Sequence, residues 1–198
     1  MHLKMNSGVW LLGAWIACSA NFVLGEDPKT ATVELANGQL TLIAPDEWVK
    51  GQPKSSIVQY EFSAPKLEEK DKAKAKAARI TFTASGGTID ANISRWFDQF
   101  EQPDKSATKD KAKLEKFDAD GQTIHWVDIP GTFKDTMGAG PFAPSKAPTM
   151  RENYRMLGAI IETKKMGNHY VKITGPTETV EKLAEGFKKM LKELKVKS

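Results

Sequence analysis

Residues 154–194 of the chain read YRMLGAIIETKKMGNHYVKITGPTETVEKLAEGFKKMLKEL, and this stretch decides the fold class. Two runs rich in β-branched and aromatic residues, 154–162 and 169–174, are predicted strands joined by a tight turn. From Val180 to Leu194 apolar side chains recur every three or four residues, which predicts a helix with Lys and Glu on its outer side. Strands joined this tightly and followed by an amphipathic helix favour an α+β domain, a largely antiparallel sheet with helices packed on it.

The preceding sequence adds strands to this sheet. Asn37-Gly38 lies between two alternating runs and predicts a hairpin over 32–43, because both central residues of a type I′ turn need positive φ. Trp48 follows the second run and is expected to fold back on the sheet as part of the core. Asp120-Gly121 predicts a second hairpin turn. Further strands are expected at 56–62, 78–84 and 122–133.

One more helix is expected before the second hairpin. Thr88 is its predicted N-cap, and Gln102-Pro103 is its predicted end. Its apolar face is formed by Ile89, Ile93, Trp96 and Phe100, which are spaced at four, three and four residues.

The segment 131–150 has no regular period, although 137–144 carries three apolar side chains. Connections longer than about 12–15 residues without secondary structure are uncommon in compact domains and often serve as lids or binding loops. Met137 and Phe142 are therefore candidate binding residues, in a loop that either covers the sheet or contacts a partner.

The first 25 residues differ from the rest of the chain. Lys4 precedes a short apolar stretch and small residues, and the first acidic residue is Glu26, which is the pattern of a secretory signal peptide. Cleavage is expected after Gly25 or, alternatively, after Ala20. We therefore expect a signal peptide over 1–25 and a single domain over 26–198, exported to the periplasm or secreted.

The alternative for this segment is a retained membrane anchor over 5–25, which contains no charged residue. Cys18 is the only cysteine of the chain. Its removal with the peptide would exclude disulfides, thiol catalysis and thiolate metal sites from the mature domain.

Positive and negative charges are nearly balanced, and most of the positive charge comes from lysine. The chain has 29 Lys and Arg against 25 Asp and Glu. Nucleic-acid-binding proteins favour Arg, whose planar guanidinium grips phosphates and guanine edges, whereas here Lys and Glu alternate along the sequence. We therefore expect a solvated mixed-charge surface and no nucleic-acid partner.

Two histidines are the candidate catalytic bases, His125 and His169, and both fall in predicted strands. Asp128 follows His125 by three positions, so on a regular strand the two side chains point to opposite faces. No serine stands in a nucleophile elbow or an S-x-x-K pattern, and no His and Cys spacing suits a metal. The sequence predicts no catalytic residue and no metal site.

Gly86-Gly87 precedes the expected helix, where free N–H groups can hold an anion. The segment lacks the Lys-Ser/Thr of a P-loop and the third glycine of a dinucleotide motif, so we expect a tight turn and no cofactor. Arg95 and Trp96 complete the candidate binding residues, although Trp96 also belongs to the apolar stripe expected in the core.

Three stretches together resemble a family of exported bacterial proteins of the kind abundant in planctomycetes: Ala44-Pro45 with Trp48, residues 86–96, and residues 170–176. The order of elements is similar, more distantly, to the PsbP/Mog1-like fold, whose members are mostly non-enzymatic binding modules in photosystem assembly or nuclear transport. The resemblance implies an antiparallel sheet sandwiched by helices and a leaning toward binding. It supplies no activity, cofactor or catalytic residue.

These observations rank three functions. The first is a non-catalytic binding module of the cell envelope, whose partner is an envelope protein or component. The second is a hydrolase acting on a small or envelope substrate, with His125 or His169 and a carboxylate brought in by the fold. The third is a structural protein tethered to the membrane by residues 5–25.

Overall fold

The structure is a computed structural model that describes residues 31–67, 76–136 and 147–197. The predicted signal peptide, the alternative anchor, Met137 and Phe142 all lie outside these residues. Along the described chain the elements are β1 (Thr32–Leu35), β2 (Leu40–Ile43), β3 (Val49–Gly51), β4 (Val58–Ala64), β5 (Ala78–Ala84), α1 (Ile89–Phe97), β6 (Phe100–Glu101), α2 (Thr108–Lys111), β7 (Lys113–Ala119), β8 (Gln122–Asp135), β9 (Thr149–Glu162), β10 (His169–Pro176), α3 (Thr177–Lys192) and β11 (Lys195–Val196).

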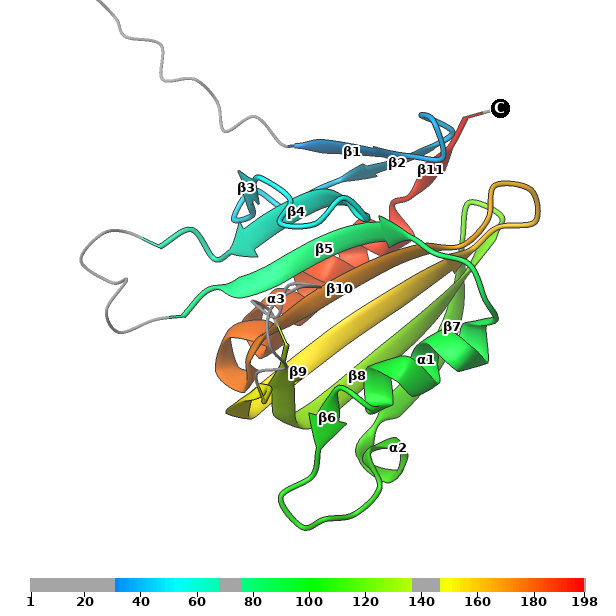
Figure 1. The fold of residues 1–198 in the computed structure, drawn as a ribbon. Coiled ribbons are helices and arrows are strands. Elements are labelled where there is room, and N and C mark those ends of the chain that lie inside the picture. The colour runs from blue at the N-terminus through cyan, green and yellow to red at the C-terminus, as the bar shows by residue number, and fades with distance from the viewer. Residues whose placement is uncertain (1–30, 68–75, 137–146, 198) are drawn as a thin grey trace, which may run out of the picture.

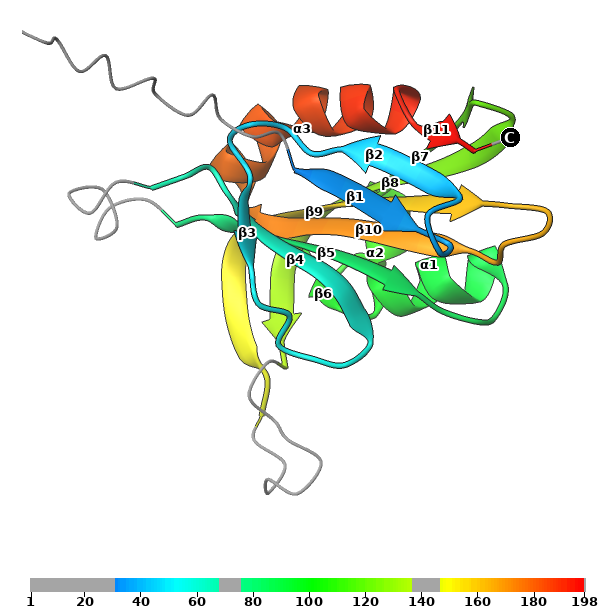
Figure 2. The ribbon, with the colours of Figure 1, turned by 90° about the horizontal axis from the view of Figure 1, so that it is seen from above.

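Two antiparallel sheets organise the domain. The larger has eight strands in the order β3-β4-β5-β10-β9-β8-β6, with β7 also paired to β8, and the smaller has the order β1-β2-β11. Helix α3 and the smaller sheet lie on one face of the large sheet, and α1 lies on the other (Figures 1 and 2). The predicted α+β class, a largely antiparallel sheet with helices packed on it, is confirmed.

The main core lies between the large sheet and α3. Alternate residues of β5, such as Ile80 and Phe82, point toward this layer and are fully buried. Trp48 is 5% exposed, and its ring centroid lies 5.7 Å from that of Phe62 and 6.2 Å from that of Phe187. Its predicted place in the core is confirmed. The predicted helical stripe is also buried, at Val180, Leu183, Phe187, Met190, Leu191 and Leu194.

Helix α1 starts as predicted but ends earlier. The Thr88 hydroxyl oxygen accepts a hydrogen bond from the Ala91 N–H at 3.2 Å, which confirms the N-cap. The helix ends at Phe97 instead of continuing to Gln102-Pro103, because Phe100 pairs with Phe133 of β8 as part of β6. Phe100, which continues the helical spacing in the sequence, therefore lies in a strand.

The segment 131–150 is more regular at its ends than expected. Strand β8 continues to Asp135 and β9 begins at Thr149, so the expected irregular segment is partly strand. The ring of Phe133 lies 5.3 Å from that of Phe100 and stacks on Tyr154 at 6.2 Å, which stabilises the extension. Residues 137–146 lie outside the described chain.

Both predicted hairpins form. The 32–43 turn is centred on Asn37 and Gly38 as predicted: their φ values are 54° and 80°, and the Gln39 N–H donates to the Ala36 carbonyl at 3.1 Å. In the second turn, Asp120 and Gly121 have φ of 46° and 73° between paired Ala119 and Gln122. Among the described residues, no helix is long and apolar enough to span a bilayer.

Candidate functional site

The face of the large sheet that carries α1 is apolar over only half of its width. On β8 and β9 this face presents Val127, Ile129, Met156 and Ile160, which α1 covers with Ile93 and Trp96. Trp96 seats directly on the backbone at Gly158, where an added Cβ would lie 2.5 Å from the ring atom Cζ3. A residue without a side chain therefore sets how closely α1 approaches the sheet.

The other half of this face is polar. Arg79, Thr81 and Thr83 alternate along β5 with the buried Ala78, Ile80 and Phe82, so they point toward the α1 side. The register places Thr81 opposite Glu61 of β4 on one side and Lys172 of β10 on the other. Charged and hydroxyl groups from three neighbouring strands thus converge beside α1.

A cavity of about 660 Å³ lies over this polar half, between the sheet, α1 and the segment that precedes β4. We call it the α1 cavity. It is lined by Lys54, Ser55, Ile57, Val58, Arg79, Thr81, Thr83, Ala84, Ser85, Asn92, Arg95, Trp96, Gln99, Thr136, Tyr170 and Lys172. Four of these residues are cationic and none is acidic.

Arg79 is the one cation of the α1 cavity with a carboxylate partner among the described residues. Its Nε and Nη2 donate to the two carboxylate oxygens of Glu61 at 2.9 and 2.8 Å, a bidentate pair. The hydrogen bond from Arg79 is the main reason why the pKa of Glu61 lies below its ordinary value. Glu61 therefore stays ionised and offsets the charge of Arg79.

Lys172 has no such carboxylate. Its Nζ donates to the Gln99 side-chain oxygen at 3.2 Å, the only hydrogen bond that this ammonium makes to the described residues. Burial and, secondarily, the positive charge of Arg79 lower the pKa of Lys172 to about 8. The surroundings therefore disfavour the charged form of Lys172.

Asn92 of α1 fixes the opposite wall. Its side-chain amide donates to the Tyr170 hydroxyl at 2.9 Å and to the Thr88 carbonyl at 2.8 Å. Its carbonyl oxygen accepts a hydrogen bond from Arg95. A buried amide therefore connects helix, strand and the cationic rim of the α1 cavity.

Two of the four predicted binding residues, Arg95 and Trp96, line this cavity, and Trp96 is also core, with 6% of its surface exposed. Sequence reasoning missed Arg79 and Lys172 as candidate site residues. The signal that was present is their alternation with core residues, Ile80 in β5 and Ile173 in β10, which places both on the polar face.

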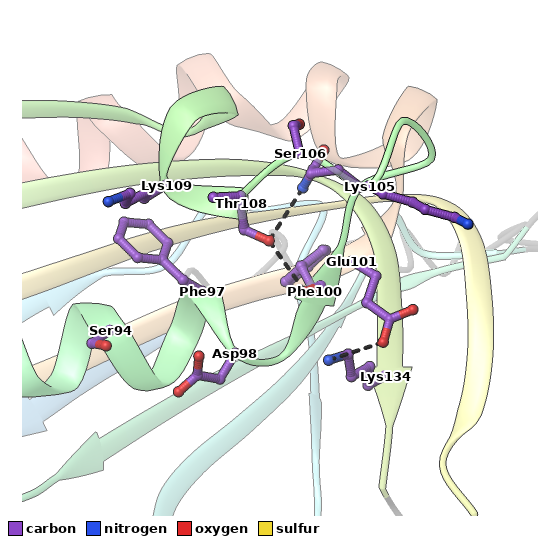
Figure 3. A pocket seen from close by; sticks show the side chains of 12 residues that line it. Ser94, Phe97, Asp98, Phe100, Glu101, Lys105, Ser106, Thr108, Lys109 and Lys134 are labelled. Atoms are coloured by element: carbon purple, nitrogen blue, oxygen red, sulfur yellow. Dashed lines mark hydrogen bonds and ion pairs between the residues drawn. The ribbon is translucent and has the colours of Figure 1, made fainter.

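A second cavity of about 560 Å³ lies between the end of α1 and the segment around α2 (Figure 3). We call it the loop cavity. Its charges are mixed: Lys105, Lys109 and Lys134 line it together with Asp98 and Glu101, and Lys134 pairs with Glu101 at 3.1 Å. It lacks the charge imbalance of the α1 cavity.

The histidines lie apart from both cavities. His125 is on the α1 face and its Nε2 lies 2.7 Å from a carboxylate oxygen of Glu162, so the fold does bring a carboxylate to it. Asp128 lies on the opposite face, as its spacing predicts, and binds Arg155. His169 is 3% exposed, and neither ring nitrogen has a hydrogen-bonding partner among the described residues.

Metal ligands are not grouped in the described ranges, where no three His, Cys, Asp or Glu side chains come together. The predicted sites at Met137 and Phe142 lie outside these ranges. The structure thus brings two predicted binding residues to one cavity and leaves both histidines outside it.

No protein-family model matches the chain, and no curated protein matches it. Among solved structures it is similar to the solution structure of cyanobacterial PsbP (CyanoP) from Synechocystis sp. PCC 6803. The sequence identity is 13%, the match covers 94% of this chain and 99% of that chain, and the TM-score is 0.49. The likeness, a PsbP-like fold with a mostly antiparallel sheet and few helices, concerns the fold alone.

Proposed function

We propose that this protein is a non-catalytic binding module of the cell envelope and that it holds a small ligand in the α1 cavity. The observation that carries the proposal is the convergence of charged and hydroxyl side chains from β5, β10 and α1 on one hollow. Its volume of about 660 Å³ lies within the range of ligand sites in proteins, roughly 300–1,000 Å³.

The walls of the α1 cavity are held by groups that fix its shape. Trp96 rests on Gly158, and the Asn92 amide bridges α1 to Tyr170. The floor consists of paired interior strands, whose backbone has little freedom to move. Because the site is already ordered, ligand binding costs little conformational entropy of the protein, which favours binding.

The test is capture of small molecules by the full-length protein. The protein is equilibrated with a small-molecule extract of its native envelope, washed, denatured, and the released compounds are identified by mass spectrometry. We expect a compound that is retained by the wild type in stoichiometric amount and recovered unchanged. Retention of no compound would contradict the proposal.

Two variants narrow the cavity from different sides. Thr83→Trp fills it from the sheet, and Ser55→Trp, at an exposed position, fills it from the rim. Circular dichroism checks that each is folded. We expect both to lose the compound, whereas Lys109→Trp in the loop cavity keeps it. Retention by both folded α1-cavity variants would place the ligand elsewhere.

The hydrolase remains the alternative proposal because His125 and Glu162 are within hydrogen-bonding distance. If an extract compound is consumed by the wild type but not by His125→Gln, the hydrolase replaces the binding module. The tethered structural protein is tested separately: a mature chain that begins at Glu26 would exclude it.

A further inference from the structure

We infer that the ligand of the α1 cavity is a small oxyanion, a molecule with a carboxylate or phosphate group that binds the Lys172 ammonium beside Arg79. This inference rests on the proposed function and names the chemical class of its ligand. Four further steps support it: the balance of charge, the free donors, the position of the cations, and the shape of the cavity.

The charge around the cavity is unbalanced. Lys54, Arg79, Arg95 and Lys172 line it, and within the described part of the chain the one carboxylate paired with any of them is that of Glu61, which is bound to Arg79. The whole chain, by contrast, is nearly neutral, with 29 basic and 25 acidic residues. A local excess of three positive charges in a hollow raises the concentration of anions there.

Donor hydrogens remain available for an anion. An ammonium has three N–H donors, and Lys172 uses one on Gln99. The Arg79 guanidinium has five, of which the bidentate pair with Glu61 uses two and leaves Nη1 without an acceptor among the described residues. Thr81 adds a hydroxyl that lines the same cavity: it follows Arg79 by two positions on β5 and lies opposite Lys172 of β10.

The sheet forces the two cations together. Thr174 is opposite Arg79 and Lys172 is opposite Thr81, so Arg79 and Lys172 are diagonal neighbours on one face of adjacent strands. Long side chains at diagonal positions can reach each other, the positive charge of Arg79 opposes that of Lys172, and burial adds to the penalty for Lys172. An oxyanion bound beside both would offset the repulsion and accept hydrogen bonds from the buried ammonium, which is the physical reason to expect one.

The cavity also has room beyond the anion. Its volume exceeds that of a bare carboxylate or phosphate, and Ile57, with 70% of its surface exposed, lines it together with Trp96. The ligand therefore carries an organic portion that contacts these apolar side chains. A small organic acid and a small phosphate ester share this description.

The pH dependence follows from Lys172. Its pKa of about 8 means that the amine is mostly protonated at pH 7 and mostly neutral at pH 9. The charge that acts on it directly is that of Arg79, which is paired with Glu61, and the other titratable groups of the cavity are Lys54, Arg95 and Tyr170. Comparison with a Lys172 variant separates their contribution from that of Lys172.

Isothermal titration calorimetry of the full-length protein tests the inference with malonate and inorganic phosphate as probes and uncharged malonamide as control. We expect at least one oxyanion to bind and malonamide not to bind. Stronger binding of malonate assigns a carboxylate ligand, and stronger binding of phosphate assigns a phosphate ligand. Failure of both oxyanions to bind, or equal binding of malonamide, would overturn the inference.

The variants locate the charge that matters. Lys172→Gln is expected to weaken oxyanion binding roughly tenfold or more, and Lys172→Arg to retain it within about threefold because the cation is kept. Lys109→Gln removes the same charge from the loop cavity and is expected to bind like the wild type. An equal loss of oxyanion affinity in Lys109→Gln and Lys172→Gln would show that only the net charge of the protein matters, and it would refute the site.

The pH series on the wild type does not depend on the folding of a variant. Between pH 7 and pH 9 the wild-type association constant for malonate should fall about tenfold, in step with the protonated fraction of Lys172, and Lys172→Gln should lack this dependence. A flat wild-type profile contradicts the inference. If the compound captured from the envelope extract is uncharged, the proposed function stands and this inference fails.

Discussion

Replacement of Gly158 by alanine tests how α1 is seated on the sheet, and with it the shape of the α1 cavity. The new Cβ would lie 2.5 Å from Cζ3 and 2.9 Å from Cε3 of Trp96, both well inside van der Waals contact. The ring belongs to a helix packed on the sheet and has no flexible end with which to withdraw. We therefore expect the helix itself to shift or the ring to leave its rotamer.

The magnitude combines two opposing effects. Overpacking of a well-packed core costs about 1–3 kcal/mol, whereas alanine in a strand gains about 0.5–1 kcal/mol over glycine. At the middle of these ranges Gly158→Ala should lower the free energy of unfolding by about 1 kcal/mol, or the Tm by about 2–4 °C for a domain of this size. Urea and thermal unfolding followed by circular dichroism measure both quantities.

Gly86→Ala is the matched control, since a Cβ at Gly86 meets no atom within 4 Å. It should leave stability unchanged or slightly raised. Trp96→Phe removes the outer ring, so the loss caused by Gly158→Ala should shrink by at least about 0.5 kcal/mol in that background. Equal stability of Gly158→Ala and Gly86→Ala, or full additivity with Trp96→Phe, would refute the seating of Trp96 on Gly158.

Two further perturbations address buried ionisable groups. Burial lowers the pKa of His169 below its ordinary 6.5, so the folded state binds fewer protons than the unfolded state. The stability from this source is complete above pH 6.5 and is lost as the pH falls toward the folded pKa. His169→Leu should remove this dependence in urea unfolding between pH 8 and pH 5, and an unchanged profile would contradict it. Glu61→Gln should lower the free energy of unfolding by about 1–3 kcal/mol and strengthen malonate binding severalfold, because Arg79 loses its compensating charge; weaker binding would count against Arg79 as part of the site.

Local signals accounted for most of the predicted fold. Thr88 and Asp120-Gly121 were predicted correctly because a cap and a two-residue turn depend on neighbouring residues only. Phe100 was misassigned to the helix because its spacing continues the apolar stripe, while its partner Phe133 lies far along the chain. Strand β3 was missed because its three residues are exposed and are defined only by pairing with β4.

The candidate site was harder to predict because a local sequence pattern does not show which strands are neighbours in the sheet. Arg95 and Trp96 were candidates from one helix, and both line the α1 cavity. Alternation places Arg79 and Lys172 on polar strand faces, but their closeness depends on the pairing of β5 with β10, two strands far apart in the chain. No property of either segment alone specifies that pairing.

The pairing of β11 with β2 has a consequence for the order of folding. It joins Lys195 to Thr41, residues separated by 154 positions, and the backbone N–H of Val196 donates to Asp120 Oδ2 at 2.7 Å. The hairpin that carries Leu40 and Leu42 therefore lacks its third strand until residues 195–196 have been synthesised. Contacts of such long range slow folding, so we expect completion of the small sheet to be a late step.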